Sequence, residues 1–302
     1  MTERLADLSA HIDGIRQLGT VVNAMRGVAA ARAQQARRCL DAVDSYAATI
    51  AFAIGRALSL SPFAPRGRDE KAKRPALIIF CAEQGFAGAF SERVFEAVGP
   101  DLVTSELFLI GTRGAAVGAE RGVVAGWTGA MPSHPDNIPK LADQAAEALY
   151  ARIAKGKIDR LDAVFSHRKL GHATMIERRR LFPFDAAALP HASLADVPLL
   201  NLTPQVLLAD LISDYLHAQL CHAALHAFAA ENEARMEAMA AARTQVERKL
   251  SSLQARLRFV RQEEITAEII ELAVGETASR KNGQRRRRLS SRTLLISPMN
   301  SG

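Results

Sequence analysis

The sequence TPQVLLADLISDYLHAQL, from Thr203 to Leu220, opens the longest uninterrupted stretch of the chain. Thr203 followed by Pro204 is typical of a helix start, because Thr accepts a hydrogen bond from a first-turn amide and Pro has no N–H to leave unpaired. From Gln205 to Val274 the sequence contains neither Gly nor Pro. We therefore predict one helix of about 70 residues, which at 1.5 Å per residue is roughly 105 Å long.

Apolar residues in this helix follow a heptad spacing, which indicates packing against another helix. The heptad positions are Met239, Val246, Leu250, Leu253, Leu257 and Val260, with Arg243 as a polar interruption. After Val260 the spacing changes phase to Ile265, Ile269 and Leu272, as in a coiled coil that unwinds or changes partner.

The first 60 residues supply a partner for that seam. They contain no Pro, and apolar side chains at three- and four-residue spacing form one stripe: Leu5, Leu8, Ile12, Ile15, Val22 and Ala29. Because the middle of the chain connects the two helices, we predict a long antiparallel coiled coil. Roughly 50 residues cannot cover a rod of roughly 70, so part of the C-terminal helix must project alone or enter another protein.

The middle of the chain alternates short apolar runs with helical segments, which predicts a small α/β domain with a mostly parallel sheet. The expected strands are residues 76–81, 107–110 and 163–166, and the expected helices begin at Ser91 and span 114–120 and 138–155. Pro183, Pro190 and Pro198 predict an extended return into the long helix. The fold class is therefore a helical coiled coil combined with an α/β domain.

These patterns divide the chain into five parts. They are an N-terminal helix (1–60), a linker (61–75), the α/β domain (76–200), the long C-terminal helix (203–278) and a basic, disordered tail (279–302).

The formal net charge of +7 resides in the tail. Its basic residues are Arg280, Lys281, Arg285, Arg286, Arg287, Arg288 and Arg292, and it has no acidic residue, whereas residues 1–278 carry 32 basic and 32 acidic side chains. The folded part is therefore formally neutral. The tail is either a binding site for nucleic-acid or lipid phosphates or a solvated end.

No motif in the sequence indicates an enzyme, a cofactor or a metal centre. The loop Glu83–Phe90 follows a strand and opens a helix, but it lacks the glycine pattern of a dinucleotide site and the GK[ST] of a phosphate loop, so a structural turn is favoured. His217, His222 and His226 lie at spacings of five and four, but there is no HExxH motif, because no carboxylate stands between His222 and His226. Three separated Cys residues indicate a reducing compartment. No apolar run approaches the roughly 20 residues that cross a bilayer.

Two signatures, one near each end of the chain, resemble the gamma subunit of F-type ATP synthases. Ala24-Met-Arg-Gly-Val-Ala-Ala30 with Arg32 is similar to the family's AM-x-x-VAA-x-K/R. Glu231-Asn-Glu-Ala-Arg-Met-Glu-Ala-Met239 and Arg261-Gln-Glu-Glu-Ile-Thr-Ala-Glu-Ile269 are similar to E-x-x-A-R-M-x-A-M and R-Q-x-x-I-T-x-E-(I/L). His11, Thr20 and Asn23, where the family carries basic residues, indicate a divergent member, such as that of a second, sodium-pumping type.

The resemblance implies a rotor shaft without catalytic residues, cofactor or metal. In that family the terminal helices turn inside a collar of alpha and beta subunits, whose beta subunits carry the nucleotide chemistry, and the α/β domain lies against the epsilon subunit and the membrane c-ring. The implied location is the cytoplasmic face of the bacterial inner membrane. The implied contacts with the collar are Met25, Arg26, Arg235, Arg261, Gln262, Thr266 and Glu268. The alternative is a coiled-coil scaffold whose Arg-rich tail binds RNA or anionic lipid.

Overall fold

A computed structural model describes residues 2–60, 74–168, 174–184 and 200–293. It divides into two compact units, and the two long helices contribute to both. Unit 1 comprises residues 1–21 and 242–302, and unit 2 comprises residues 22–241. Within the described ranges, no helix combines the length and apolar character that spanning a bilayer requires.

Unit 2 contains a five-stranded sheet in the order β3-β2-β1-β4-β5. The strands are β1 (Pro75–Phe80), β2 (Glu106–Ile110), β3 (Trp127–Gly129), β4 (Arg160–His167) and β5 (Met175–Phe182). All neighbouring strands are parallel except β4 and β5, which are antiparallel. The sheet is mostly parallel, as predicted, but it is mixed because β5 is an antiparallel strand at one edge.

Strands β3 and β5 were absent from the sequence prediction, for different reasons. Strand β3 has only three residues. Strand β5 contains Arg178, Arg179 and Arg180, and such a charged run is typical of a solvated segment rather than a strand. It forms a strand because it lies at a sheet edge, where its arginines pair with Asp162 and Glu177.

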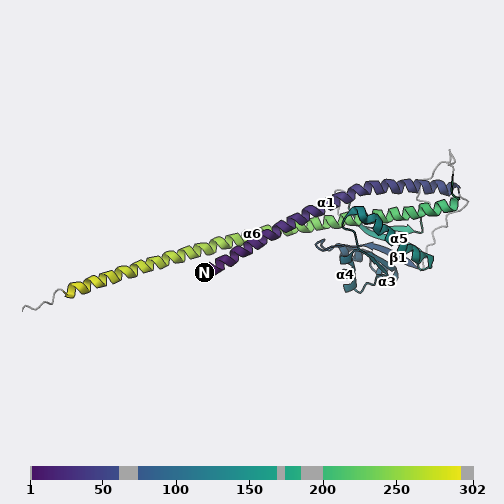
Figure 1. The fold of residues 1–302 in the computed structure, drawn as a ribbon. Helices are drawn as coiled ribbons and strands as arrows, with labels where there is room; N and C mark the ends of the chain where they lie inside the picture. The colour runs from purple at the N-terminus through teal and green to yellow at the C-terminus, as the bar shows by residue number, and fades with distance from the viewer. Residues whose placement is uncertain (1, 61–73, 169–173, 185–199, 294–302) are drawn as a thin grey trace, which may run out of the picture. The chain divides into compact units, whose positions relative to one another are not determined.

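Helices cover both faces of the sheet (Figure 1). The helices of the domain are α2 (Phe90–Val98), α3 (Asp101–Thr104), α4 (Thr112–Glu120), the short 3-10 helix η1 (Pro135–Asn137) and α5 (Ile138–Ala154). Side chains of α2 and α4 pack on the face that carries Leu77, Ile79 and Leu109. The opposite face, with Ile78, Phe108 and Phe165, is covered by α5 and by parts of the two long helices.

The two long helices are α1 (Thr2–Leu60) and α6 (Pro204–Thr293). In unit 2 they run antiparallel, because Arg37 of α1 forms an ion pair with Glu233 of α6, and Asp44 lies 3.3 Å from His222. In unit 1 a Cβ on Gly19 would stand 3.1 Å from Cγ1 of Val246, so glycine permits a close approach of the helices there.

The predicted seam on α6 is the face that becomes buried. Met239, Leu253 and Val260 are buried, and Val246, Leu250 and Leu257 are half-buried. The next apolar positions, Ile265, Ile269 and Leu272, are 51%, 60% and 74% exposed. The seam therefore ends at Val260, as the change of phase predicts.

Helix α6 continues to Thr293, so the predicted boundary at residue 278 is too early. Arg, Lys and Gln are good helix formers, and the single Gly283 costs about 1 kcal/mol, which does not end a long helix. The first Pro after the helix start is Pro298. The predicted linker at residues 61–73, the extended return at 185–199 and the last nine residues, 294–302, lie outside the described residues.

Candidate functional site: a polar junction between α6 and the loop after β1

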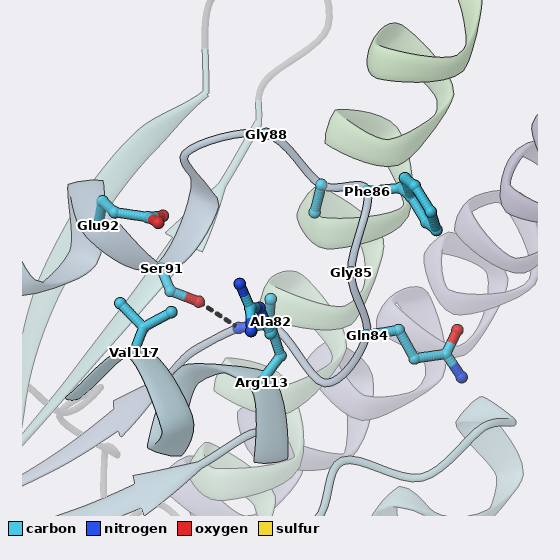
Figure 2. Close-up of a pocket in the computed structure, with 10 residues that line it drawn as sticks. Ala82, Gln84, Gly85, Phe86, Gly88, Ser91, Glu92, Arg113 and Val117 are labelled. Carbon is cyan, nitrogen blue, oxygen red and sulfur yellow. Dashed lines mark hydrogen bonds between the residues drawn. The ribbon is translucent and has the colours of Figure 1, made fainter. Parts of the chain in front are cut away.

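The site begins where β1 ends at the carboxyl edge of the sheet. The loop from Cys81 to Ala89 leads from β1 into α2, and the Ala82 N–H donates to the Ser91 Oγ at 3.1 Å (Figure 2). Beside it lies a cavity of about 410 Å³, which Glu92 of α2 and Arg113 of α4 also line. Phe86 is 67% exposed with a positive φ of 62°, and its ring points away from Ser91 and Glu92 (Figure 2).

Arg235 of α6 joins this loop to the helix. Its Nε donates to the Gly85 carbonyl and its Nη2 to the Gln84 carbonyl, each at 3.2 Å. Its Nη1 donates to the Asn232 Oδ1 at 3.1 Å, and its Nη2 also pairs with Glu231. The guanidinium therefore uses all three of its nitrogens within the chain.

Glu231, one turn before Arg235, accepts hydrogen bonds from the same loop. Its two carboxylate oxygens accept the N–H groups of Glu83 and Gln84 at 3.1 and 3.2 Å. Glu231 and Arg235 are only 3% and 5% exposed. A buried charge pair is costly unless further hydrogen bonds satisfy it, and the loop backbone supplies those bonds.

The loop is also hydrogen-bonded to the segments that follow β2 and β3. The Glu83 carboxylate accepts the Thr112 N–H at 3.0 Å, which satisfies a free amide at the start of α4. It also accepts the Thr112 hydroxyl at 2.8 Å and the Met131 N–H at 2.8 Å. One acidic side chain thus ties together the segments that follow β1, β2 and β3.

A histidine cluster lies elsewhere in unit 2, between α6 and strand β4. The Nε2 atoms of His222 and His226 are 3.1 Å apart, and both rings contact Phe165. Among the described residues, no three His, Cys, Asp or Glu side chains are arranged to hold a metal ion. The two rings pack against Phe165 and lie within hydrogen-bonding distance of each other.

Burial makes this pair sensitive to acid. Desolvation lowers the pKa of both His222 and His226 to about 4, and Arg179 beside His222 acts in the same direction. Since the folded pKa lies below the ordinary value of about 6.5, the unfolded chain binds more protons between pH 6.5 and 4. Stability from these groups is present above pH 6.5 and is lost as the pH falls toward 4.

We therefore expect the Tm of the chain to fall between pH 7.5 and 5, with a loss in unfolding free energy of about 2 kcal/mol for each histidine. The double variant His222→Gln/His226→Gln is expected to have a lower Tm at pH 7.5 but a flatter dependence over this range. Thermal unfolding followed by circular dichroism at both pH values measures this. Equal slopes in the variant and the wild type would contradict the assignment. The lowered pKa of Asp162, held by Arg160 and Arg178, acts only at lower pH.

A Cys-His-Asp arrangement on α6 and α5 does not form a nucleophile. The Cys221 Sγ lies 3.9 Å from the His217 Nε2, which is 3.1 Å from the Asp143 Oδ1. Burial raises the pKa of Cys221 to about 12, so the thiol stays protonated at neutral pH.

The structure places the residues implied as partner contacts in three environments. Met25 and Arg26 are half-buried on α1. Arg261, Gln262, Thr266 and Glu268 are exposed on α6, so their side chains are available to a partner. Arg235 is different, since it is buried and bonded to its own chain, and its contact with a partner stays a prediction.

Comparison with known proteins shows similarity to ATP synthase proteins over most of the chain. A sequence model of the ATP synthase family matches residues 4–278. The ATP synthase gamma chain of Chlorobium limicola is 25% identical over 292 residues, covering 91% of this chain and 98% of that protein.

Two solved structures from Euglena gracilis mitochondrial ATP synthase share the fold. The rotor in rotational state 1 matches with a TM-score of 0.59 and 12% identity, over 88% of this chain and 100% of that chain. A chain of the OSCP/F1/c-ring assembly in rotational state 3 matches with a TM-score of 0.60 and 13% identity, over 100% and 99%.

Proposed function

The chain belongs to the ATP synthase family, and from this premise we propose that it is the gamma subunit, the central rotor shaft of such an enzyme. It carries no nucleotide chemistry of its own. It couples ion flow in a membrane sector to ATP synthesis or hydrolysis in the beta subunits of a surrounding alpha/beta collar. The epsilon subunit and the c-ring are its proposed partners at the α/β domain, on the cytoplasmic face of the bacterial inner membrane.

The observation that carries this proposal is the uncovered apolar face of α6. Gly19 approaches Val246, and Asp7, Leu8 and His11 line one cavity with Arg256 and Val260, which supports an antiparallel coiled coil. With equal rise in both helices, Thr2 stands opposite about residue 263. The exposed residues Ile265, Ile269 and Leu272 therefore lie beyond the reach of α1.

A helix that leaves three large apolar side chains in water gains from a partner that covers them. Burial of such a side chain contributes about 1.5–3 kcal/mol. A second exposed stripe lies on α1, where Leu18, Val21 and Val28 follow helical spacing on either side of Met25. A collar that surrounds both helices covers both stripes.

The proposed contacts with the collar are Met25 and Arg26 on α1 and Arg261, Gln262, Thr266 and Glu268 on α6. Arg235 is also proposed, but it would first have to break its hydrogen bonds within this chain. The exposed side chains of Arg261, Gln262, Thr266 and Glu268 can form different hydrogen bonds with the collar in each rotational state. Only such differences in contact energy between states shift an equilibrium.

Reconstitution tests the proposal. The full chain is co-expressed with the alpha and beta subunits of its own organism, and with epsilon and the membrane sector in a parallel preparation. We expect a stable complex with alpha and beta, and ATP-driven ion transport only when this chain is present. Failure to co-purify, or transport that is the same without the chain, would contradict the proposal.

A further inference from the structure

The Glu231–Arg235 pair lies at a point where the apolar contacts between α6 and the loop are few. The small cluster at this point consists of Ala82, Ala87, Phe90 and Ala230, with Ala234 packed against it. Alanine side chains are short and allow a helix to slide or turn with little loss of contact. The large apolar side chains of α6 that pack in the main core, among them Leu225 and Phe228, come before this point. At the loop itself, apolar packing therefore adds little to the hold on α6.

The hydrogen bonds of the pair are directional, and they run both ways between helix and loop. Glu231 accepts two loop amides, and Arg235 donates to two loop carbonyls. The planar guanidinium reaches both carbonyls only in one orientation of the helix. Four bonds to consecutive residues 83–85 thus define one rotation and one height of α6 against the loop.

The loop itself is held to the body of the domain. Glu83 binds the start of α4 and the Met131 amide, and the Cys81 N–H donates to the Ile110 carbonyl at 2.8 Å. A displacement of α6 at Arg235 is therefore transmitted to three connections at the carboxyl edge of the sheet.

We infer that Glu231 and Arg235 form the joint through which the α/β domain and α6 exchange torque. The inference rests on the proposed rotor function and assigns both side chains as positioning residues. In this arrangement Arg235 acts mainly within its own chain, while the exposed residues from Arg261 onward face the collar. The joint stiffens the shaft, so that work done on the domain is delivered to the helix rather than lost in twisting.

Three variants and a matched control test the joint in the full reconstituted complex. Arg235→Gln removes the guanidinium fork. Glu231→Gln removes the charge and replaces one of the two acceptor oxygens by an NH2 group that cannot accept a loop N–H. Arg235→Lys keeps the charge but cannot reach both carbonyls. Glu237→Gln, on the same helix, removes an exposed partner of Arg168, and such surface pairs contribute little. The measurement is ions transported per ATP hydrolysed, normalised to assembled complex, with and without an opposing ion gradient.

We expect the Gln variants to transport at least twofold fewer ions per ATP, with a larger deficit against the gradient. Arg235→Lys is expected to fall between them and the wild type, and Glu237→Gln to equal the wild type. Variants that lower only the yield of complex, with an unchanged ratio, would show a merely structural role and overturn the inference. If the wild-type chain itself supports no transport, the proposed function fails instead.

A measurement on the full chain alone keeps the inference testable if a variant does not assemble. The Glu83 and Gln84 amides donate to Glu231, so slow hydrogen exchange at these two amides indicates that their bonds to Glu231 are formed. We expect exchange at least tenfold faster in Arg235→Gln and Glu231→Gln than in Glu237→Gln. Equal exchange in all of them would show that the pair does not fix the loop.

Discussion

The triple variant Ile265→Gln/Ile269→Gln/Leu272→Gln is expected to fold as the wild type does and to lose its place in the collar. The three side chains are more than half exposed in the chain alone, so their replacement changes the free energy of unfolding by at most about 0.5 kcal/mol. Gln is nearly as good a helix former as Leu, so the helix itself is kept.

The expected loss in assembly follows from the area that a collar would cover. The three side chains expose 51%, 60% and 74% of their surface, so a collar would newly cover the equivalent of nearly two of them. At about 1.5–3 kcal/mol for each full side chain, the dissociation constant is expected to be at least about 100-fold weaker. Co-purification with alpha and beta subunits over a dilution series measures it. Val103→Gln, which replaces an isolated apolar residue that is 90% exposed on α3, is the control and should assemble normally. Normal assembly of the triple variant would mean that this face is not a docking surface.

The elements with strong local signals are the ones that sequence reasoning located. The absence of Gly and Pro over 70 residues and the heptad spacing are local properties, and they predicted a helix and the seam from Met239 to Val260. The buried apolar runs of β1 and β2 stand out in the same way. Strand β5 could not be found like this, because its Arg178-Arg179-Arg180 run becomes favourable only beside Asp162 and Glu177.

The polar junction could not be predicted because its partners are far apart in the sequence. Arg235 and Gly85 are 150 residues apart, and only the folded domain brings them together. One signal was present: three charged residues, Glu231, Glu233 and Arg235, directly follow an apolar stretch of α6 that is rich in alanine. A helix face that is apolar before and after such charges buries them, and buried charges need internal partners.

The same reasoning from local pattern explains the error at the C-terminus. Seven basic residues and no acidic one between 279 and 302 predict a solvated tail by composition, yet the backbone continues as helix to Thr293. Composition reports charge, whereas helix continuation depends on the residue propensities and on the absence of Pro. The sequence model of the family ends at residue 278, fifteen residues before the end of α6 at Thr293.

The substitution Gly114→Ala is expected to destabilise unit 2 strongly, although alanine is the better helix former. Gly114 lies in the first turn of α4, and its N–H donates to the Ala82 carbonyl at 2.8 Å. A Cβ there would overlap the Cβ of Cys81 and stand 3.2 Å from its Sγ. The Cβ of Cys81 is fixed by the backbone and cannot rotate away, so α4 must move and break its contacts with the loop.

Overpacking of this kind costs about 1–3 kcal/mol or more, which outweighs the gain of up to about 1 kcal/mol in helix propensity. Chemical unfolding of the full chain measures the difference. Gly27→Ala, in α1, is the matched control, because nothing lies within 4 Å of the added Cβ, and it should raise stability. The double variant Cys81→Gly/Gly114→Ala removes the overlapping atom and should recover part of the loss. If Gly114→Ala is as stable as the wild type, close contact between α4 and the end of β1 does not hold the junction in place.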